Sequence, residues 1–373
     1  MSIRLLFCLC QAVIQTLAWH GISEGRHAEF FPYLRESGTD YYLTRSRTLP
    51  LAMEVLDAAQ KEGIKVFVSC PAMLENPDSI VPLLKNHPAL AGYYIKDEPE
   101  TWDLPDLGKL VSRISALDGG HPCYVNLYPN WAWGGKEAYA SNLQLFADSV
   151  NVPFFSFDQY SITEADGKIS VRPLWYRNLE EMRNLSLERG KPFWAFALLL
   201  SHYLGPPSPP AFYPVPTLGH LRLQAFSDLA YGAQVIQYYT FRGAVDKEGV
   251  RTPVFDLLKQ VNAEIHALSP VFAGADVRQV WHAGPSLPDG TRAFEPFGPV
   301  ASLQTGEAGL VASLVEKGRR QYLALVNKDC TEAQEISLNF SRKTKQVGKD
   351  GKRSPFRAGA IVLEPGDIIL FEL

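Results

Sequence analysis

The sequence predicts an α/β protein, a (β/α)8 TIM barrel followed by a small all-β sandwich domain. Two observations support this fold class. Short apolar runs alternate with amphipathic helical segments through most of the first 270 residues, and the helical period disappears after Pro270. Continuous apolar strands between helices indicate a parallel sheet covered on both faces. Eight such units in roughly 250 residues is the usual size of a closed barrel.

Eight runs are apolar and rich in β-branched or aromatic residues, as buried strands are. They are Ala12–Ile22, Asp40–Thr44, Ile64–Ser69, Leu90–Lys96, Cys123–Leu127, Pro153–Tyr160, Pro192–Leu200 and Ala233–Phe241. A segment of helical character follows each strand. These segments are Glu29–Ser37, Pro50–Glu62, Pro77–Asn86, Leu104–Leu117, Glu137–Asp148, Pro173–Arg189, Leu218–Tyr231 and Thr252–Leu268. No glycine-rich phosphate loop follows a strand, which weakens the runner-up fold, a doubly wound open sheet.

The C-terminal part has short strand-like runs separated by turn residues and no helical period. The runs are Leu310–Leu314, Gln321–Asn327, Ala333–Phe340, Ala360–Leu363 and Asp367–Leu373. We therefore expect the barrel at residues 11–270 and a β-sandwich accessory domain at 271–373.

Residues 1–18 have two interpretations. Their early positive charge, apolar centre and small last residue, Ala18, are typical of a secretory signal. The same region, as Ala12–Ile22, supplies the first strand of the barrel, and we favour the strand because the count of eight needs it. A signal would imply a secreted or periplasmic location. No other run approaches the ~20 apolar residues of a membrane span.

The composition narrows the class of partner. The formal net charge is −4, so there is no global basic excess for nucleic acid. Five scattered cysteines lack a Cys-x-x-Cys pair, which predicts neither a zinc site nor a disulfide framework. The histidines also lack ligand spacing, so we expect no metal or cofactor, and a metal-dependent hydrolase or a lyase is a weak hypothesis. The many aromatic residues suit core packing and also the apolar faces of sugars.

The strongest candidate for chemistry is the end of the fourth strand. Barrel enzymes carry their catalytic groups where strands end, and here Asp97, Glu98 and Glu100 crowd one strand terminus. Carboxyl groups held together, next to apolar surface, raise one another's pKa, as a general acid requires. Glu98 is the preferred catalytic acid and Asp97 the second choice. The alternative is a solvated loop in which Glu100 and Asp103 cap the next helix.

The segment Leu90–Pro99 (LAGYYIKDEP) resembles the strand-four signature of clan-A glycoside hydrolases, in which the acid/base Glu follows an Asn and often precedes Pro. Asp97 replaces that Asn here. Leu221–Phe241 is similar to the segment from helix seven to strand eight of family 42-like enzymes, and Tyr322–Asp329 resembles their accessory β-domain. The resemblance implies hydrolysis of a glycosidic bond in an oligo- or polysaccharide, with Glu98 as acid/base.

The seventh strand departs from this pattern, because clan-A enzymes place a nucleophilic Glu at its end and Phe193–His202 has no carboxylate. The next candidate is Asp158, at the end of strand six, where it would face Glu98 across the barrel mouth. A separation of about 5–5.5 Å favours a covalent intermediate, and about 6.5–9.5 Å favours direct attack by water. Glu24, near the end of strand one, is a poorer candidate.

The other strand ends predict a sugar pocket lined by rings, amides and a guanidinium. Its expected members are Trp19, His20, Asn126, Tyr128, Trp131, Gln159, Tyr160, His202, Tyr239 and Arg242. The leading hypothesis is therefore a glycoside hydrolase. The alternative is a non-catalytic carbohydrate-binding barrel that lacks the strand-seven nucleophile, since fold alone does not establish function.

Overall fold

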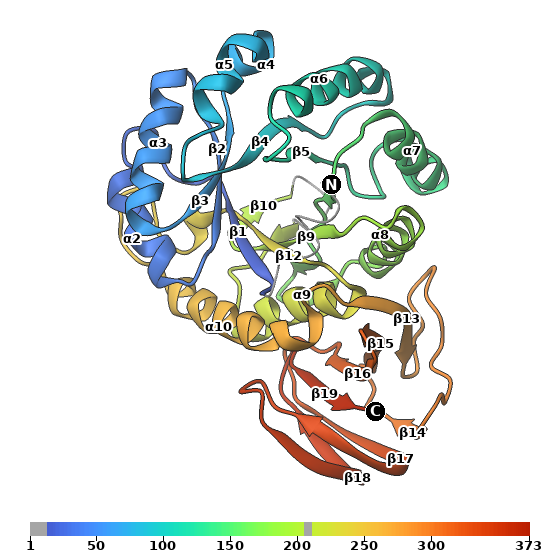
Figure 1. Cartoon of the computed structure of the whole chain (residues 1–373). Coiled ribbons are helices and arrows are strands. Elements are labelled where there is room, and N and C mark those ends of the chain that lie inside the picture. Colours follow the sequence, from blue (N-terminus) through green and yellow to red (C-terminus); the bar gives the residue numbers. More distant parts are fainter. Residues whose placement is uncertain (1–12, 205–210) are drawn as a thin grey trace.

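The computed structural model describes residues 13–204 and 211–373. It confirms a (β/α)8 barrel followed by a small all-β domain, which Figure 1 shows as a ring of helices around strands with an antiparallel unit packed beneath. Residues 1–12, including Cys8 and Cys10, and residues 205–210 lie outside the described part of the chain.

The barrel strands are all parallel and follow the predicted order along the chain. They are β1 (Gln15–Trp19), β2 (Tyr41–Arg45), β3 (Lys65–Ser69), β4 (Leu90–Asp97), β5 (Cys123–Asn126), β6 (Phe155–Phe157), β9 (Phe193–Leu198) and β12 (Val235–Tyr239). Their spatial order is β5-β4-β3-β2-β1-β12-β9-β6. A parallel bridge between Leu127 and Phe157 joins the two ends of this order. The sheet therefore closes on itself, and the open doubly wound alternative is wrong.

Helices cover the outside of the barrel, and most of them are amphipathic, as their periodicity predicts. The helix of residues 218–231 is instead buried along almost its whole length. The helices are α2 (His27–Glu36), α3 (Leu49–Glu62), α4 (Pro71–Glu75), α5 (Pro77–Leu84), α6 (Leu104–Leu117), α7 (Gly135–Ser149), α8 (Trp175–Arg189), α9 (Leu218–Tyr231) and α10 (Val254–Phe272). The ends of α3 show why these boundaries are readable from sequence. The Thr48 side chain accepts a hydrogen bond from the backbone of Leu51, and Gly63 ends the helix at a φ of 72°.

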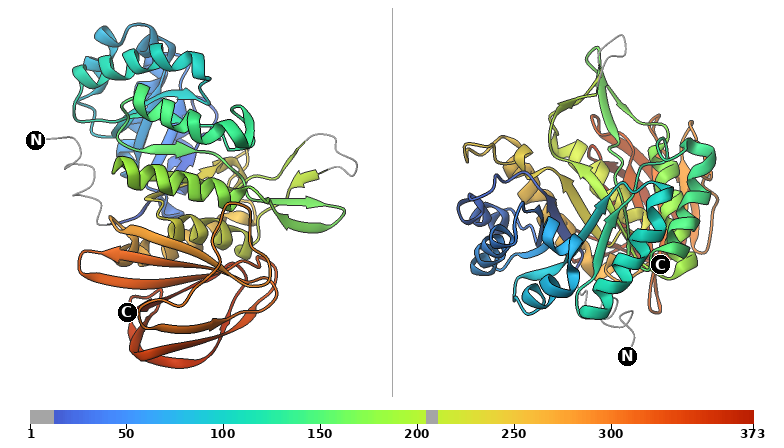
Figure 2. Two further views of the ribbon diagram at one scale, coloured as in Figure 1. Left: turned by 90° about the vertical axis from the view of Figure 1, so that its right-hand side faces the viewer. Right: turned by 90° about the horizontal axis from the view of Figure 1, so that it is seen from above.

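A small antiparallel sheet, absent from the sequence prediction, projects from the barrel (Figure 2). Its strands are β7 (Ile162–Ala165), β8 (Lys168–Val171), β10 (His202–Tyr203) and β11 (Ala211–Tyr213). They belong to the connections that follow β6 and β9. Strand six is consequently shorter than predicted, because the chain leaves the barrel after Phe157 to enter this sheet. Part of the predicted extended segment Pro206–Pro216 forms β11, and its first residues lie outside the described part.

The C-terminal domain is one antiparallel sheet that forms two layers. Its strands are β13 (Asp276–Ala283), β14 (Val300–Gln304), β15 (Leu310–Lys317), β16 (Arg320–Asn327), β17 (Gln334–Val347), β18 (Arg353–Leu363) and β19 (Ile368–Glu372). The long strand β17 pairs with β14 and β18 and, near its end, with β19. Leu325, Leu338 and Phe371 are among the side chains that fill the core between the layers. The sequence missed β13 and β14.

Candidate active site

Glu98 lies directly after β4 in a strained backbone conformation. Its φ is +45°, which is uncommon for a residue with a side chain, and such conformations gather at functional sites. The Glu98 amide donates a hydrogen bond of 2.9 Å to the carbonyl of Asn126, at the end of β5. Two neighbouring strands therefore fix the backbone that carries this carboxyl group.

Asp158 follows β6, and its amide donates to the carbonyl of Leu127 at 3.3 Å. The carboxyl groups of Glu98 and Asp158 lie close enough together for each to shift the pKa of the other. The Asn126 side chain also hydrogen-bonds to Asp158. One oxygen of Asp158, Oδ1, is buried and has no hydrogen-bond partner in the described part of the chain. It is available to a hydroxyl group of a ligand.

The environment raises the pKa of both carboxyl groups. Burial is the main cause for Glu98, and the negative charge of Asp97 adds to it. Burial also raises the pKa of Asp158 well above its usual range, and the charge of Glu98 raises it further. Two acids this close cannot both ionise without repulsion, so the raised pKa values favour a pair that shares one proton.

Asp97 has a different role in the geometry. Its carboxylate forms an ion pair of 2.6 Å with Arg45, at the end of β2, and accepts a hydrogen bond of 3.2 Å from Asn126. The same guanidinium donates to the hydroxyl of Tyr94 at 2.8 Å. Asp97 is thus a fixed anion beside the pair. The sequence analysis missed Arg45, although its position as the last residue of a barrel strand could have identified it.

A fully buried polar network lies beneath the carboxyl pair. The Ser156 hydroxyl donates to Asn126 Oδ1 at 2.8 Å and accepts from the Gln237 amide at 2.9 Å. The Tyr124 hydroxyl donates to Gln237 Oε1. Buried polar groups that satisfy one another hold a single geometry, so this network fixes the Asn126 amide that contacts both Asp97 and Asp158. None of Tyr124, Ser156 and Gln237 was predicted from sequence.

Two predicted pocket residues at the end of strand one lie below the surface. Trp19 is only 4% exposed, because its ring packs against Tyr94, Tyr124 and Phe196 inside the barrel. Trp19 therefore offers little ring surface at the mouth, and its predicted place in the sugar pocket stays a prediction. His20 lies next to it at a φ of +50°, and its Nε2 is buried without a partner in the described part. Burial lowers the pKa of His20 to about 3, so the ring is neutral.

Aromatic residues from strands six, seven and eight form one cluster beside Asp158. The Tyr160 ring stacks on Tyr239 at 5.3 Å and contacts Tyr213 at 5.5 Å. His202 lies 4.6 Å from Tyr213, measured between ring centroids. The structure thus brings Tyr160, His202 and Tyr239 together, as predicted, and adds Tyr213, which the sequence analysis did not select.

The remaining predicted residues are more scattered. Tyr128 donates to Glu100 Oε1 at 3.1 Å, Trp131 is half exposed, and Arg242 is exposed beyond strand eight. Gln159 is 3% exposed with neither amide atom partnered in the described residues. Glu100 belongs with Asp103 to a capping box on the 3-10 turn η1 (Thr101–Asp103), which is the structural role considered for it. Glu24 pairs with Arg47 and takes no part in the site.

The strand-seven position has no carboxylate, as the sequence indicates. All residues of β9 are buried and apolar. The carboxyl groups that meet at this mouth are therefore those that follow β4 and β6.

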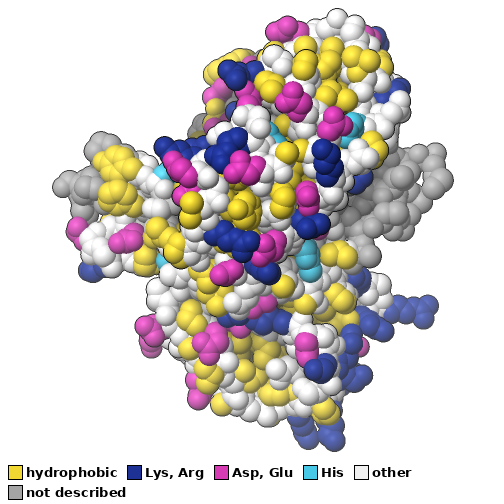
Figure 3. All heavy atoms as spheres, turned by 90° about the vertical axis from the view of Figure 1, so that its left-hand side faces the viewer, with side chains coloured by type: hydrophobic (Ala, Val, Ile, Leu, Met, Phe, Trp, Pro, Cys, Tyr) yellow, Lys and Arg dark blue, Asp and Glu magenta, His cyan; other side chains and the backbone are white. Residues whose placement is uncertain are grey.

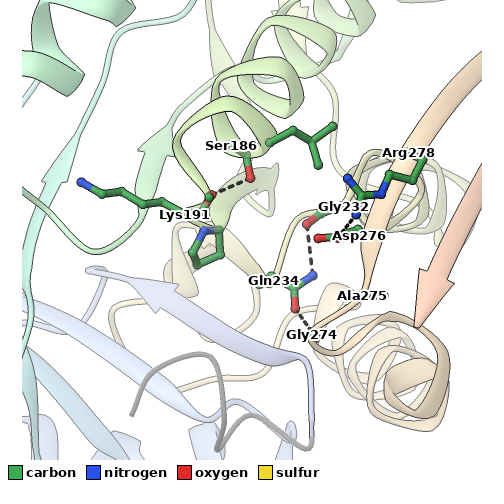
Figure 4. Close-up of a pocket in the computed structure, with 11 residues that line it drawn as sticks. Ser186, Lys191, Gly232, Gln234, Gly274, Ala275, Asp276 and Arg278 are labelled. Atoms are coloured by element: carbon green, nitrogen blue, oxygen red, sulfur yellow. Dashed lines mark hydrogen bonds and ion pairs between the residues drawn. The ribbon is translucent and has the colours of Figure 1, made fainter. Parts of the chain in front are cut away.

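One cavity, of about 260 Å³, lies at the opposite end of the barrel, where β9 and β12 begin (Figure 4). Its polar groups bind the protein itself. The Gln234 amide donates to Gly232 and accepts from Gly274, and Ser186 donates to the carbonyl of Lys191. The N-terminal face of a barrel usually serves stability. The carboxyl pair is therefore the better candidate for chemistry.

Residues 13–204 and 211–373 contain no cluster of three or more His, Cys, Asp or Glu side chains that could hold a metal ion. Over the same residues, no helix is long and apolar enough to cross a membrane.

Known proteins resemble this chain in fold. The sequence matches no known protein family and no curated protein. A family 39 glycoside hydrolase from the gut symbiont Bacteroides cellulosilyticus WH2 has a similar structure, with a TM-score of 0.53 and 10% identity over 97% of this chain and 81% of that one. A noncanonic maltogenic alpha-amylase from Thermotoga neapolitana gives a TM-score of 0.51 and 9% identity, over 98% and 99% of the two chains. At these identities the likeness shows a shared fold.

Proposed function

We propose that this protein is a glycoside hydrolase that cleaves a glycosidic bond in an oligo- or polysaccharide. The observation that carries the proposal is that the Glu98 and Asp158 carboxyl groups follow β4 and β6 at the C-terminal mouth of the barrel and shift the pKa of one another. Glycoside hydrolysis requires two carboxyl groups in opposite protonation states, and the buried pair supplies one proton and one negative charge. The likeness of Leu90–Pro99 to clan-A enzymes, and of Leu221–Phe241 to family 42-like ones, supports the same reaction.

The residues divide the reaction between them in this proposal. Glu98 gives its proton to the leaving oxygen as the glycosidic carbon–oxygen bond breaks, and Asp158 stabilises the positive charge that develops on the sugar ring. Water then adds to the anomeric carbon, and its proton returns to the carboxyl pair. Asp97, held by Arg45, keeps the pKa of both groups raised.

Substitution of the pair tests the proposal. Glu98→Gln and Asp158→Asn keep the shape of each side chain and remove its ability to ionise. We expect kcat on a responsive aryl glycoside to fall by about 10²–10⁴-fold in each variant. Calorimetry would show that sugar binding persists. Glu24→Gln, the same change at another strand end, is the control and should retain activity. Full turnover by Glu98→Gln would refute the assignment.

A second candidate function, a non-catalytic carbohydrate-binding barrel, is favoured by one observation, the apolar end of β9. A broad panel of glycans separates the two. Binding without cleavage of any member would favour this second function, whereas release of reducing ends that depends on Glu98 would favour the hydrolase.

A further inference from the structure

Arg172 follows β8 in the small projecting sheet and is held in place by two aromatic rings. Its guanidinium carbon lies 5.7 Å from the centroid of the Trp131 ring and 5.3 Å from that of Tyr213. Its backbone amide donates to the carbonyl of Ser161 at 2.7 Å. Cation–π contacts of this kind fix the orientation of the planar guanidinium and leave its N–H groups free to bind an anion.

Arg172 has no carboxylate partner among the described residues, in contrast to Arg45 and Arg47 at the barrel mouth. Arg45 forms an ion pair with Asp97, and Arg47 forms one with Glu24. Within residues 13–204 and 211–373, no acidic side chain forms an ion pair with Arg172, although it is partly buried. A partly buried cation that lacks a counter-charge gains free energy when an anion binds beside it.

The guanidinium is also close to the proposed catalytic pair. Burial raises the pKa of Tyr213, the charge of Arg172 opposes this rise, and the charge of Asp158 adds to it. The Tyr213 hydroxyl therefore lies within electrostatic range of both groups. The Tyr213 ring contacts Tyr160, two residues after Asp158. An anionic group held by Arg172 would belong to the reacting sugar or to its neighbour.

We propose that the substrate is an acidic glycan and that Arg172 binds a carboxylate or sulfate group of it. The inference rests on the proposed glycosidase function and names the substrate class. A guanidinium matches a carboxylate or sulfate in a bidentate geometry. Trp131, whose side chain is 54% exposed, offers an indole face to the apolar side of a sugar ring next to that charge. A cation, an aromatic ring face and two carboxyl groups thus lie at the same mouth of the barrel. Together they suit an acidic sugar.

A second surface has the same charge preference. Between residues 342 and 357, on the ribbon of β17 and β18, there are seven Lys or Arg residues and one acid. Exposed side chains without an ion-pair partner anywhere in the described chain are Arg342, Lys343, Lys345 and Arg357. Figure 3 shows Lys and Arg side chains projecting from the lower part of the molecule, which is the C-terminal domain. We expect this basic ribbon to bind the part of a long acidic polysaccharide that lies outside the barrel mouth.

Calorimetry with matched oligosaccharides tests the role of Arg172. The Glu98→Gln variant of the full chain prevents turnover and serves as the background. The ligands are a neutral glucan oligomer, an oligogalacturonide and a sulfated heparin oligosaccharide of similar length. Arg172→Gln should weaken binding of the acidic ligand by about 10–100-fold and leave neutral ligands unaffected. The stronger of the uronate and sulfate responses identifies the group that is bound. Lys168→Gln, the same change in charge on the same small sheet, is the control.

The outcomes separate the inference from the function. If neutral glycans bind and are cleaved while acidic ones are not preferred, or if Arg172→Gln behaves like Lys168→Gln, the acidic substrate is refuted and the glycosidase remains. If no glycan of any class binds or is cleaved, the proposed function itself fails. Arg172→Lys keeps the positive charge but lacks the paired N–H donors of the guanidinium, so it should restore only part of the affinity.

The basic ribbon has its own measurement. A variant with glutamine at positions 342, 343, 345 and 357 should lose salt-dependent retention on immobilised polygalacturonate or heparin. It should keep the affinity of the parent for short acidic oligosaccharides. Glutamine at four exposed lysines elsewhere (Lys61, Lys109, Lys168 and Lys247) is the control. This part of the proposal would be overturned if the first variant lost no retention. It would also be overturned if the ribbon bound anionic vesicles or DNA as well as it binds the acidic polysaccharide.

Discussion

The carboxyl groups of Glu98 and Asp158 shift the pKa of one another although they follow β4 and β6, strands with another strand between them in the barrel. The small radius of an eight-stranded barrel brings the ends of these strands close together. The buried amide of Asn126, on the intervening strand β5, bonds to Asp158 and to Asp97. One side chain on the middle strand therefore links the acid groups on either side.

The first prediction concerns the charge of Asp97, which raises the pKa of both members of the pair. Asp97→Asn removes this charge and keeps one of the two side-chain oxygens, of which Oδ2 accepts from Arg45 and Oδ1 from Asn126. The pair is active while it holds one proton, so both limbs of the pH profile of kcat/KM should move to lower pH. Asp106→Asn removes an exposed charge on α6 and should leave the profile in place. A shift to higher pH, or none, would contradict the electrostatic role of Asp97.

The fold was largely predictable because each element has local signals. The apolar runs that became β3 and β12 and the capped helices α3 and α9 depend on composition and spacing over fewer than twenty residues. The projecting sheet was missed because its strands are two to four residues long and β10 pairs with β11 across a proline-rich connection. Such pairing depends on contacts between segments that are far apart in the chain, and local sequence patterns do not show these contacts.

The site was only partly predictable for a related reason. The rule that chemistry lies at strand ends found Glu98, Asp158 and Asn126, and the structure brings these three together. The rule shows at which end of the barrel a residue lies, but not whether its side chain is buried or exposed there. Trp19 lies at the predicted end of the barrel but is covered by three aromatic rings. Arg172 lies in the small projecting sheet, so the positions of the barrel strands do not predict it.

The second prediction concerns Asp228, a buried acid of α9 that the proposed chemistry does not use. Neither of its oxygens has a hydrogen-bond partner in the described chain, and burial raises the pKa of Asp228 well above its usual range. The folded state keeps the proton while the unfolded state releases it above about pH 4. The resulting contribution to stability is therefore full below that pH and is lost progressively as the pH rises.

Asp228→Asn keeps the neutral shape and removes this dependence. Urea unfolding should show that the variant gains stability over the parent as the pH is raised from 4 to 8, with little difference at pH 4. Asp166→Asn, at an exposed turn whose positive φ also suits Asn, is the matched control. Parallel pH curves for Asp228→Asn and its parent would show that the buried carboxyl group does not titrate differently on folding.

The third prediction concerns Arg183, which ties α8 to the first strand of the C-terminal domain. Arg183 is buried, forms a 2.6 Å ion pair with Glu180, and donates to the carbonyls of Val277 and Arg278. Arg183→Met leaves a buried carboxylate and two carbonyls without their donor. The free energy of unfolding should fall by about 3–5 kcal/mol. Arg113→Met breaks the exposed pair with Asp78 and should cost less than about 1 kcal/mol. Equal losses would mean that burial does not decide the cost of the pair.

The last prediction concerns Gly219 in the first turn of α9, where the barrel touches the C-terminal domain. A Cβ atom added there would lie 2.2 Å from the carbonyl oxygen of Cys330 and 2.8 Å from the side chain of Pro365. Backbone cannot yield as a flexible side chain does, so Gly219→Ala should displace the loop that carries Cys330. The thiol of Cys330 is now buried. Its labelling by a thiol reagent, followed by peptide mass spectrometry, should be faster in Gly219→Ala, while Cys123, inside the barrel, should react as slowly as before. Gly119→Ala is the control for the loss of a glycine, because its φ is not positive and an added Cβ would meet only Ser115 O, at 4.0 Å. Faster labelling of Cys330 in that variant as well would indicate a general loss of stability rather than a clash at this contact.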